Sequence, residues 1–332
     1  MKKSELKLDD IFDMAWNWRL PALLMQAHTA GLFDAAQGGW KEAEDIARLL
    51  EADKRATYLL LLGLAGMGLM EKSKTRFRNS ELVERSLVRS SPDYRGHILS
   101  LATRQAENWF RIPEVLKSGR PVAKPEMNSQ EAEAWHKTFI MAMDDIARQY
   151  SHRIIDALPV QNGMNIMDIG AGPGRHMIEL LKKFPDTKTT AFDRPASRGT
   201  VLGLAGKEGV ADRMTFIGGD LTVDSFGEEA YDGILISNVL RIVGPDKAAG
   251  LFKRVARALK PGGFLAINEI PIGPDDDIGP GAVFAVQIML GTAEGDIHTN
   301  ADICGWMEEA GLTAESTNTI GDRMEITIGR KQ

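Results

Sequence analysis

After about residue 158 the chain changes from a helical pattern to short apolar runs that alternate with amphipathic helical stretches. This alternation constrains the fold more strongly than any other feature of the sequence. The runs have strand length, and the stretches between them carry apolar residues at helical spacing; the runs read NIMDI, TKTTAFD, RMTFI, YDGILIS and FLAINEI. Strands joined by helices form βαβ units, whose strands pair in a mainly parallel sheet. The sequence therefore predicts an α/β, doubly wound domain over residues 159–332.

Residues 1–90 combine two helical patterns with two short strand-like runs. The stretch KEAEDIARLL places Ile46 and Leu50 on one helical face, EADKRATYLLLLGLAGMG follows after a turn, and LMEKSKTRFRN gives two strands around a polar turn. This order suggests a winged helix. A DNA-reading helix presents polar side chains to base edges, but the second helix here is apolar beyond Arg55. Because an apolar helix face needs burial, the sequence favours packing or dimerisation over DNA reading.

Charge and cysteine content exclude several classes of protein. The chain carries 40 Lys and Arg against 46 Asp and Glu, a net charge of -6, which argues against a general nucleic-acid binder. Cys304 is its one cysteine, so no internal disulfide can form and a reducing, cytoplasmic setting is expected. The N-terminal MKKSELKLDD lacks the apolar core of a signal peptide, and the run YLLLLGLAGMGLM is shorter than the ~20 residues of a membrane span. We therefore expect no nucleic-acid partner, no membrane span and no metal site.

Residues 91–158 read as a helical connector rich in aromatic and methionine side chains, in NWFRIPEVL and WHKTFIMAMDDIARQYSHRIIDAL. A stripe of this kind is typical of a packed core. Its place just before the α/β domain also suits a ligand pocket, because small-molecule sites favour domain junctions and apolar linings. Both interpretations stay open. The candidate pocket walls are Trp109, Phe139, Met143 and, further along the chain, Met289.

The segment NIMDIGAGPGRHMIELLKKFP is the most informative one, a strand followed by a glycine turn and an amphipathic helix. Gly170, Gly172 and Gly174 allow a sharp turn and a close approach of the backbone to a ligand, because no Cβ stands in the way. The free N–H groups at the start of the helix suit an anionic group. The spacing G-x-G-x-G is neither the dinucleotide fingerprint nor a P-loop, so the turn alone does not identify its ligand.

Acidic residues follow the next strands, at the edge where a doubly wound sheet binds ligands. Asp193, ~20 residues past the glycines, can accept hydrogen bonds from both hydroxyls of a ribose. Asp220 follows the third strand and is placed to accept a hydrogen bond from an adenine amine. Either residue alone is equally well explained as a turn residue or a helix cap. Together with the glycine turn they indicate a nucleoside site.

On these motifs the sequence resembles the class I S-adenosylmethionine-dependent methyltransferases, through MDIGAGPGR, the strand-end Asp193, GGDL and ALKPGG. The blocks NWFRIPEVLKSGRPV and FIMAM extend the resemblance, over about residues 11–329, to the small-molecule O-methyltransferases that include caffeate, acetylserotonin and polyketide methyltransferases. The resemblance implies a Rossmann-like, seven-stranded sheet ending in an antiparallel hairpin, here AESTNTIGDRMEITIGR. It also implies a homodimer formed through the N-terminal domain.

The same resemblance, with the strand-end pattern, assigns the S-adenosylmethionine site. The glycine turn and Asp193 hold the cofactor, Asp220 and Leu221 contact its adenine, and Ser237 and Asn238 lie near its sulfur. The candidate cofactor-binding residues are Asp168, Gly170, Gly172, Gly174, Asp193, Arg194, Asp220, Leu221, Ser237 and Asn238.

The sequence departs from that family where its histidine base is expected. The family reads V-L-H-D-W after the fourth strand, whereas this chain reads VLRIV, so Arg241 takes the place of the histidine. Of the family's two catalytic glutamates, one matches Glu269 and the other is replaced by Ile297; the neighbouring His298 is expected to point elsewhere. A neutral phenol, with a pKa of ~10, gains from a base near neutral pH, but arginine stays protonated and only donates hydrogen bonds. Arg241 can hold a carboxylate or an anionic acceptor, or it can be an exposed loop residue or pair with Asp246 or Glu269.

Three functions follow from this departure. The motifs favour methyl transfer to a small, aromatic or polyketide-like acceptor that needs no histidine base: a carbon or nitrogen nucleophile, a carboxylate or an acidic phenol, held in line with the sulfonium. The second is a relative that keeps the cofactor but decarboxylates or hydroxylates, and the third is a winged-helix regulator. In the first, Arg241 and Glu269 are catalytic residues that face the acceptor, and His298 belongs to the pocket. GPDDDIGPGAVF, residues 273–284, forms either a mobile rim or a plain solvated loop.

Overall fold

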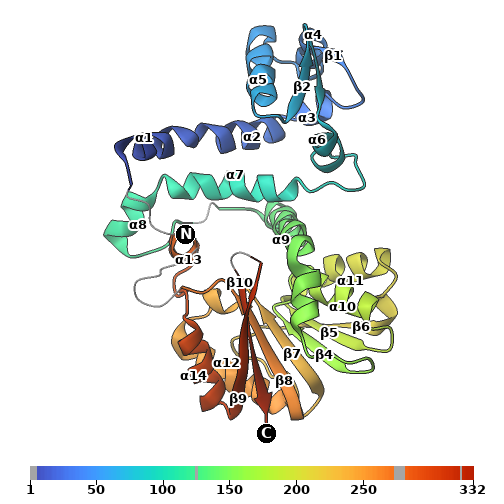
Figure 1. Ribbon diagram of the computed structural model, residues 1–332, viewed down its shortest axis with the longest axis vertical. Coiled ribbons are helices and arrows are strands. Elements are labelled where there is room, and N and C mark those ends of the chain that lie inside the picture. Colours follow the sequence, from blue (N-terminus) through green and yellow to red (C-terminus); the bar gives the residue numbers. More distant parts are fainter. Residues whose placement is uncertain (1–5, 124–125, 273–280, 322–323) are drawn as a thin grey trace. The chain divides into compact units, whose positions relative to one another are not determined.

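The structure is a computed structural model that describes residues 6–123, 126–272, 281–321 and 324–332. The chain divides into two units, residues 1–107 and 108–332 (Figure 1), whereas the sequence predicted boundaries after residues 90 and 158. The boundary between the units lies inside helix α7 (His97–Trp109). The segment predicted as a connector therefore contributes to both units.

The N-terminal unit packs helices around a small antiparallel sheet of strand order β1-β3-β2. Its core includes Ile46, Leu61, Leu64 and Phe77, which are fully buried. The predicted pair of helices and the predicted β-ribbon are confirmed as α4, α5 and the β2–β3 hairpin, and the winged-helix assignment stays a prediction. Its elements before α7 are α1 (Leu8–Asn17), α2 (Arg19–Thr29), α3 (Leu32–Ala35), β1 (Lys41–Glu42), α4 (Ala43–Leu49), α5 (Lys54–Gly66), β2 (Met70–Ser73), β3 (Arg76–Asn79) and α6 (Glu81–Ser86).

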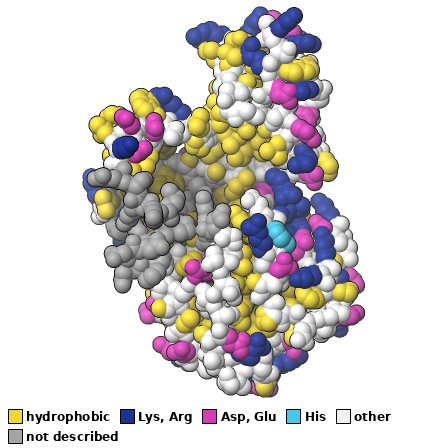
Figure 2. Space-filling view, viewed as in Figure 1, with side chains coloured by type: hydrophobic (Ala, Val, Ile, Leu, Met, Phe, Trp, Pro, Cys, Tyr) yellow, Lys and Arg dark blue, Asp and Glu magenta, His cyan; other side chains and the backbone are white. Residues whose placement is uncertain are grey.

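Helix α5 is only partly covered by its own unit. It begins where it does because Asp53 caps it: the carboxylate accepts a hydrogen bond from the Ala56 N–H at 2.7 Å. Leu61 faces the core, but Leu59 and Leu60 are 49% and 40% exposed. Apolar side chains therefore reach the surface of this unit (Figure 2).

The C-terminal unit is built on a seven-stranded sheet of order β6-β5-β4-β7-β8-β10-β9 (Figure 1). The first five strands in this order are parallel, and β10 runs antiparallel to both β8 and β9. The predicted α/β sheet with its C-terminal antiparallel hairpin is thus confirmed. The strands are β4 (Asn165–Ile169), β5 (Lys188–Asp193), β6 (Met214–Gly218), β7 (Tyr231–Ser237), β8 (Leu259–Glu269), β9 (Leu312–Ile320) and β10 (Met324–Lys331).

Strand β8 begins earlier than the sequence predicted. The glycines of ALKPGG were expected to close the preceding helix, but α12 (Pro245–Ala258) ends before them and β8 already includes Leu259. Leu259 pairs with Tyr231, and the register shifts before Phe264 pairs with Gly233. This β-bulge accommodates the extra residues between Leu259 and Phe264 within the strand. Pairing with β7 therefore begins before the glycines that were expected to end the helix.

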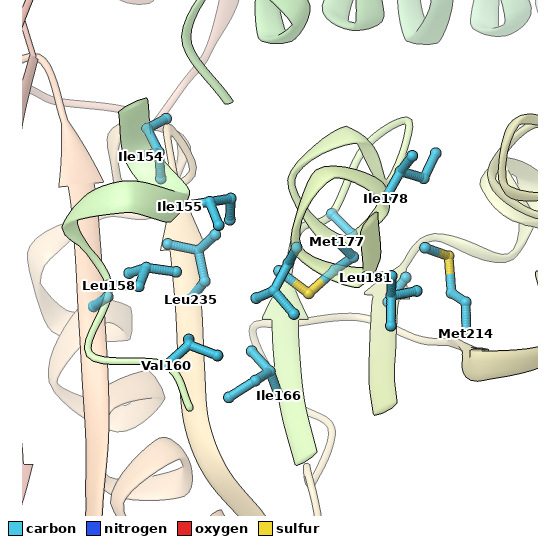
Figure 3. Close-up of a cluster of buried hydrophobic side chains, with 14 of the residues drawn as sticks. Ile154, Ile155, Leu158, Val160, Ile166, Met177, Ile178, Leu181, Met214 and Leu235 are labelled. Atoms are coloured by element: carbon cyan, nitrogen blue, oxygen red, sulfur yellow. The ribbon is translucent and has the colours of Figure 1, made fainter. Parts of the chain in front are cut away.

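Helices cover both faces of the sheet, because successive strand residues point to opposite faces. Ile166 lies in the apolar cluster beneath α9, α10 and α11 (Figure 3). Its neighbour Met167 lies in the cluster beneath α12 and α14. The helices of this unit not yet given are α8 (Ile112–Ser118), α9 (Ser129–Ala157), α10 (Arg175–Lys183), α11 (Arg198–Lys207), α13 (Gly281–Gly291) and α14 (Asn300–Glu309). Three short 3-10 turns are η1 (Pro195–Ser197), η2 (Ala211–Arg213) and η3 (Leu240–Ile242).

A buried ion pair fixes α9 to α10. Arg175, the first residue of α10, is 1% exposed, and its guanidinium donates to both oxygens of Asp144 on α9, at 2.7 and 3.1 Å. Glu208 accepts a further hydrogen bond from Arg175 at 3.0 Å. A cation at a helix N-terminus is unfavourable by itself, so these carboxylates are what make this position tolerable. Helix α9 is therefore held in place beside the turn that precedes α10.

Candidate functional site

The glycine turn joins β4 to α10 at the carboxyl edge of the sheet. Gly170, Gly172 and Gly174 have φ values of 76°, 54° and 74°, which L side chains rarely adopt. A Cβ on Gly170 would meet Val239 Cγ2 at 2.4 Å, whereas a Cβ on Gly172 would meet nothing within 4 Å. Gly170 is thus required for packing, and Gly172 leaves an open approach to the backbone for a ligand.

Asp193, the last residue of β5, ties this turn to the neighbouring strand. Its Oδ2 accepts a hydrogen bond from the Gly172 N–H at 2.8 Å. Its Oδ1 accepts from the Arg194 N–H and from the Ser197 hydroxyl, both at 2.7 Å. A carboxylate has about four acceptor positions, so one position remains on Oδ2. The sequence expected this carboxylate to take both hydroxyls of a ribose, whereas these hydrogen bonds leave one acceptor position; ribose binding by Asp193 stays a prediction.

Asp168 lies in the middle of the sheet edge and is 1% exposed. Burial, and then the nearby Asp193 carboxylate, raise the pKa of Asp168 to about 8. Its Oδ2 has no hydrogen-bond partner among the described residues. A buried carboxyl group of this kind is stabilised as the anion by a cationic ligand.

The remaining cofactor candidates lie at the same edge. Asp220 is exposed beyond the end of β6, and hydrogen bonds from Thr222 hold the pKa of Asp220 below its usual value. Leu221 is half-buried, and its carbonyl accepts a hydrogen bond from Arg254 Nη2 at 2.6 Å. Arg194 is exposed.

Ser237 ends β7, and Asn238 follows it. The Ser237 hydroxyl accepts a hydrogen bond from the Asn268 side-chain amide at 2.9 Å. Asn238 has a positive φ of 56°, unusual for a residue other than glycine, and its N–H donates to the Asn268 carbonyl at 2.8 Å. The left-handed turn at Asn238 redirects the chain into η3, where Arg241 lies.

Arg241 is buried, not exposed on a loop. Its Nη2 lies 3.1 Å from Glu269 Oε2, and the two side chains are 10% and 9% exposed. The same Nη2 donates to Asn238 Oδ1. Glu269 Oε1 accepts a hydrogen bond from the Leu240 N–H at 2.8 Å, so Glu269 fixes both the guanidinium and the backbone of the turn that carries it. The guanidinium carbon also lies 4.6 Å from the centre of the Phe284 ring.

The guanidinium of Arg241 is not fully paired. Its Nε is buried and has no partner among the described residues. A buried donor without a partner costs about 1–3 kcal/mol, so this position favours a water molecule or an acceptor atom of a ligand.

Arg241 borders a small cavity of ≈ 10 Å³, room for about one water molecule or one polar group of a ligand. The residues that line it are Arg241, Glu269, Ile270, Phe284, Ile297 and His298. Both Ile297 and His298 line the cavity, although the sequence expected neighbouring side chains to point apart; the assignment of His298 to the acceptor pocket stays a prediction. His298 Nε2 lies 3.3 Å from the Leu240 carbonyl oxygen, and its ring meets Trp306 edge to face.

The predicted pocket walls lie elsewhere in the unit. Trp109 Nε1 donates to Gln287 Oε1 at 2.7 Å, and Trp109 packs against an apolar cluster containing Leu290. Phe139 and Met143 are half-buried on α9, and Met289 is 42% exposed on α13. None of these four lines the described part of the cavity beside Arg241. Of the predicted rim, residues 273–280 lie outside the described residues, and 281–284 begin α13.

Sequence reasoning missed three side chains of this region. Phe284 was predicted only as the last residue of a rim or loop, whereas it lies on α13 and contacts Arg241 from there. The other two are Ser197 and His136: the Ser197 hydroxyl in η1 donates to Asp193, and His136 Nε2 on α9 lies 3.3 Å from that hydroxyl. Ser197 could have been found as a polar residue four positions after the strand-end aspartate.

No described helix has the length and apolar content to cross a membrane. Among the described residues, no three His, Cys, Asp or Glu side chains are grouped so that they could hold a metal ion.

The chain is similar to several known proteins. A family model described as an O-methyltransferase domain matches residues 120–313. The chain is 27% identical to 3-hydroxy-5-methyl-1-naphthoate 3-O-methyltransferase of Streptomyces sahachiroi, over 90% of this chain and 88% of that protein. It is also 27% identical to the tetracenomycin polyketide synthesis 8-O-methyl transferase TcmO of Streptomyces glaucescens, over 81% of this chain and 80% of that protein. Human N-acetylserotonin methyltransferase, solved in complex with SAM, shares the fold with a TM-score of 0.84 at 22% identity, over 100% of this chain and 99% of that one.

Proposed function

The chain belongs to the O-methyltransferase family and is an S-adenosylmethionine-dependent methyltransferase, and on that premise we propose that it methylates a small, aromatic or polyketide-like acceptor without a histidine base. The acceptor is one that already carries a negative charge near the transfer position, or one whose carbon or nitrogen atom is the nucleophile. The observation that carries this proposal is the buried Arg241, paired with Glu269 at the end of β7.

The residues at the carboxyl edge of the sheet fit S-adenosylmethionine. Gly172 leaves its backbone open, and Asp193 keeps one acceptor position for a ribose hydroxyl. The carboxyl group of Asp168 is buried and lacks a partner for Oδ2, which suits a ligand that carries positive charge. When bound, this cofactor supplies a methyl group activated by a sulfonium. The protein contributes chiefly by positioning the nucleophile in line with it.

Arg241 can bind an acceptor but cannot deprotonate it. A guanidinium has five N–H donors and no acceptor atom. Glu269 neutralises it from one side, and the unpartnered Nε is left to donate a hydrogen bond to an anionic oxygen. A carboxylate or phenolate that is itself the methylated group has no proton to lose and so needs no further base, which is why the absence of the family's histidine at this position does not prevent transfer.

The names of the relatives support the acceptor class. The relative from Streptomyces sahachiroi is named for a hydroxylated naphthoate, an aromatic acid that combines a hydroxyl group with a carboxylate. The relative from Streptomyces glaucescens is named for a polyketide. We therefore propose an aromatic acceptor with an acidic group that pairs with Arg241.

A pair of model acceptors tests this proposal. Formation of S-adenosylhomocysteine is measured with 3-hydroxy-2-naphthoate and with 2-naphthol, which lacks the carboxylate. We expect kcat/KM at least tenfold higher for the naphthoate, a ratio of about one ion-paired hydrogen bond. Arg241→Met should abolish this preference, whereas Arg257→Met, which removes an exposed arginine paired with Glu228, should preserve it. Equal turnover of both compounds, or a preference that survives Arg241→Met, contradicts the role of Arg241.

We also propose that the chain forms a homodimer through its N-terminal unit. Helix α1 has no buried residue, and its large apolar side chains Phe12 and Trp16 are 53% and 58% exposed. Exposed apolar side chains of this kind mark an interaction surface. Light scattering should give the mass of two chains, and Phe12→Glu with Trp16→Glu should give one, whereas Asp9→Lys on the same helix should not. A wild-type monomer would contradict the proposal. The cytoplasmic setting and the absence of a nucleic-acid partner stay predictions.

A further inference from the structure

A chain of hydrogen bonds links helix α9 to the carboxylate at the end of β5. The Ser197 hydroxyl donates to Asp193 Oδ1 at 2.7 Å. His136 Nε2 on α9 lies 3.3 Å from the same hydroxyl oxygen. Ser197 is fully buried and His136 is half-buried. Asp193 is therefore linked, through Ser197, to helix α9, which precedes the first strand of the sheet.

The direction of each of these hydrogen bonds follows from the donors and acceptors that the groups possess. A carboxylate only accepts hydrogen bonds, and a hydroxyl has a single proton to donate. Because the Ser197 proton goes to Asp193, the hydrogen bond between His136 and Ser197 must come from the imidazole N–H at Nε2. Burial, and then the nearby Arg194, lower the pKa of His136, which favours the neutral ring, and the hydrogen bond to Ser197 favours the tautomer with its proton at Nε2.

Helix α9 is a rigid support for this histidine. Asp144, two helical turns after His136, forms the buried two-bond pair with Arg175 at the start of α10. Arg148, one turn further on, also donates to Asp144 at 2.7 Å. The helix that carries His136 is thus fixed to the helix that the glycine turn begins, which keeps the histidine at a set distance from the turn.

We propose that His136 is a positioning residue for the cofactor: through Ser197 it orients the Asp193 carboxylate that receives the ribose. The inference rests on the proposed function, because it requires S-adenosylmethionine at this edge. With Oδ1 occupied by Ser197 and by the Arg194 N–H, the remaining acceptor position of Asp193 is on Oδ2, beside Gly172. Without His136 the Ser197 hydroxyl gains alternative orientations, and the carboxylate that it holds gains rotational freedom that cofactor binding must then remove.

Calorimetric binding of S-adenosylhomocysteine to the full chain tests the proposal. We expect His136→Ala to weaken binding about fivefold, the net contribution of one hydrogen bond. His136→Gln supplies an amide N–H in place of the imidazole N–H and should stay within about twofold of wild type. His152→Ala, which removes an exposed histidine from the same helix, is the matched control and should bind as wild type does. Thermal unfolding of each variant, measured in parallel, separates loss of affinity from loss of folding.

A double substitution shows whether the effect passes through Ser197. Ser197→Ala removes the intermediate hydroxyl, so adding His136→Ala to it should weaken binding no further. A full fivefold additional loss in that background, or His136→Ala binding as tightly as wild type, would overturn the inference. If instead the wild-type chain fails to bind S-adenosylhomocysteine, it is the proposed cofactor site that fails, so the two failures are distinguishable.

Discussion

Glu269→Gln separates the structural role of the Arg241–Glu269 pair from its role toward the acceptor. Glutamine keeps the shape of the side chain and can still accept the hydrogen bond from the Leu240 N–H, but it no longer neutralises Arg241. Removing one partner of a fully buried ion pair costs about 3–5 kcal/mol. Here the pair is 10% and 9% exposed, and Asn238 Oδ1 still accepts from Arg241. We therefore expect a loss of about 2–3 kcal/mol in the free energy of unfolding.

Thermal unfolding, followed by calorimetry, measures this loss. In a unit of the size of residues 108–332, each kcal/mol lowers the midpoint by about 2–4 °C, so the midpoint of Glu269→Gln should fall by about 5–10 °C. The matched control is Glu228→Gln. It neutralises the partner of Arg257 in a pair whose side chains are 69% and 67% exposed, and should change the midpoint little because exposed pairs contribute little.

An anionic ligand should raise the unfolding midpoint that Glu269→Gln lowers. An Arg241 without its neutralising carboxylate attracts an anion more strongly, so 3-hydroxy-2-naphthoate should raise the midpoint of Glu269→Gln by more degrees than that of wild type. Ligand at a hundred times its Kd stabilises a protein by about 2.7 kcal/mol, enough to restore most of the loss. Unchanged midpoints for Glu269→Gln would show that the pair is not buried as described. A lowered unfolding midpoint of Glu269→Gln that the naphthoate does not raise would show that Arg241 does not receive the acceptor's anionic group.

Three further changes should have distinct effects. Asp168→Asn should stabilise the protein at pH 8 by a few kcal/mol and have little effect near pH 4. The pKa of Asp168 in the folded state is raised from 3.8 to about 8, so the wild-type protein loses stability as pH rises through this window. Urea unfolding at several pH values measures the difference. Arg175→Met leaves a buried carboxylate short of its partner and should lower the free energy of unfolding by about 3–5 kcal/mol, measured in the same way. Gly172→Ala should fold, with about 1–2 kcal/mol of backbone strain, but lose at least tenfold in affinity for S-adenosylhomocysteine by calorimetry; Gly170→Ala should instead unfold at lower temperature, because its Cβ would meet Val239 at 2.4 Å. An Asp168→Asn profile parallel to wild type, an unchanged Arg175→Met, or equal effects of the two alanines would each contradict the corresponding reasoning.

The sheet could be predicted from the sequence because local signals determine it. Strand-length apolar runs, the glycine turn and the runs flanking Gly321 are all contained in short windows, and their order in the sheet follows from the rules of βαβ connection. The start of β8 was predicted five residues late, because its pairing with β7 outweighs the local glycine signal.

The candidate site was less predictable, because its contacts join residues distant in the chain. Arg241 meets Glu269 only because β7 and β8 lie side by side, and the sequence left that pairing as one of several possibilities. His136 lies 61 residues before Ser197, and nothing in the sequence near either residue indicates that α9 carries it to the end of β5. Phe284 contacts Arg241 from α13. In the sequence Phe284 ends a Gly-, Pro- and Asp-rich stretch, which did not predict the helix that positions it.

The dependence of kcat/KM on pH tests methyl transfer without a histidine base most directly. Two hydroxynaphthoates are compared, one of them with a nitro group that lowers the pKa of its hydroxyl. If the acceptor must arrive already anionic, the rise in kcat/KM with pH will follow each compound's own hydroxyl pKa, and so begin at lower pH for the nitro compound. A rise at the same pH for both compounds that disappears in His298→Ala would contradict the proposal and assign the base to the histidine beside Arg241.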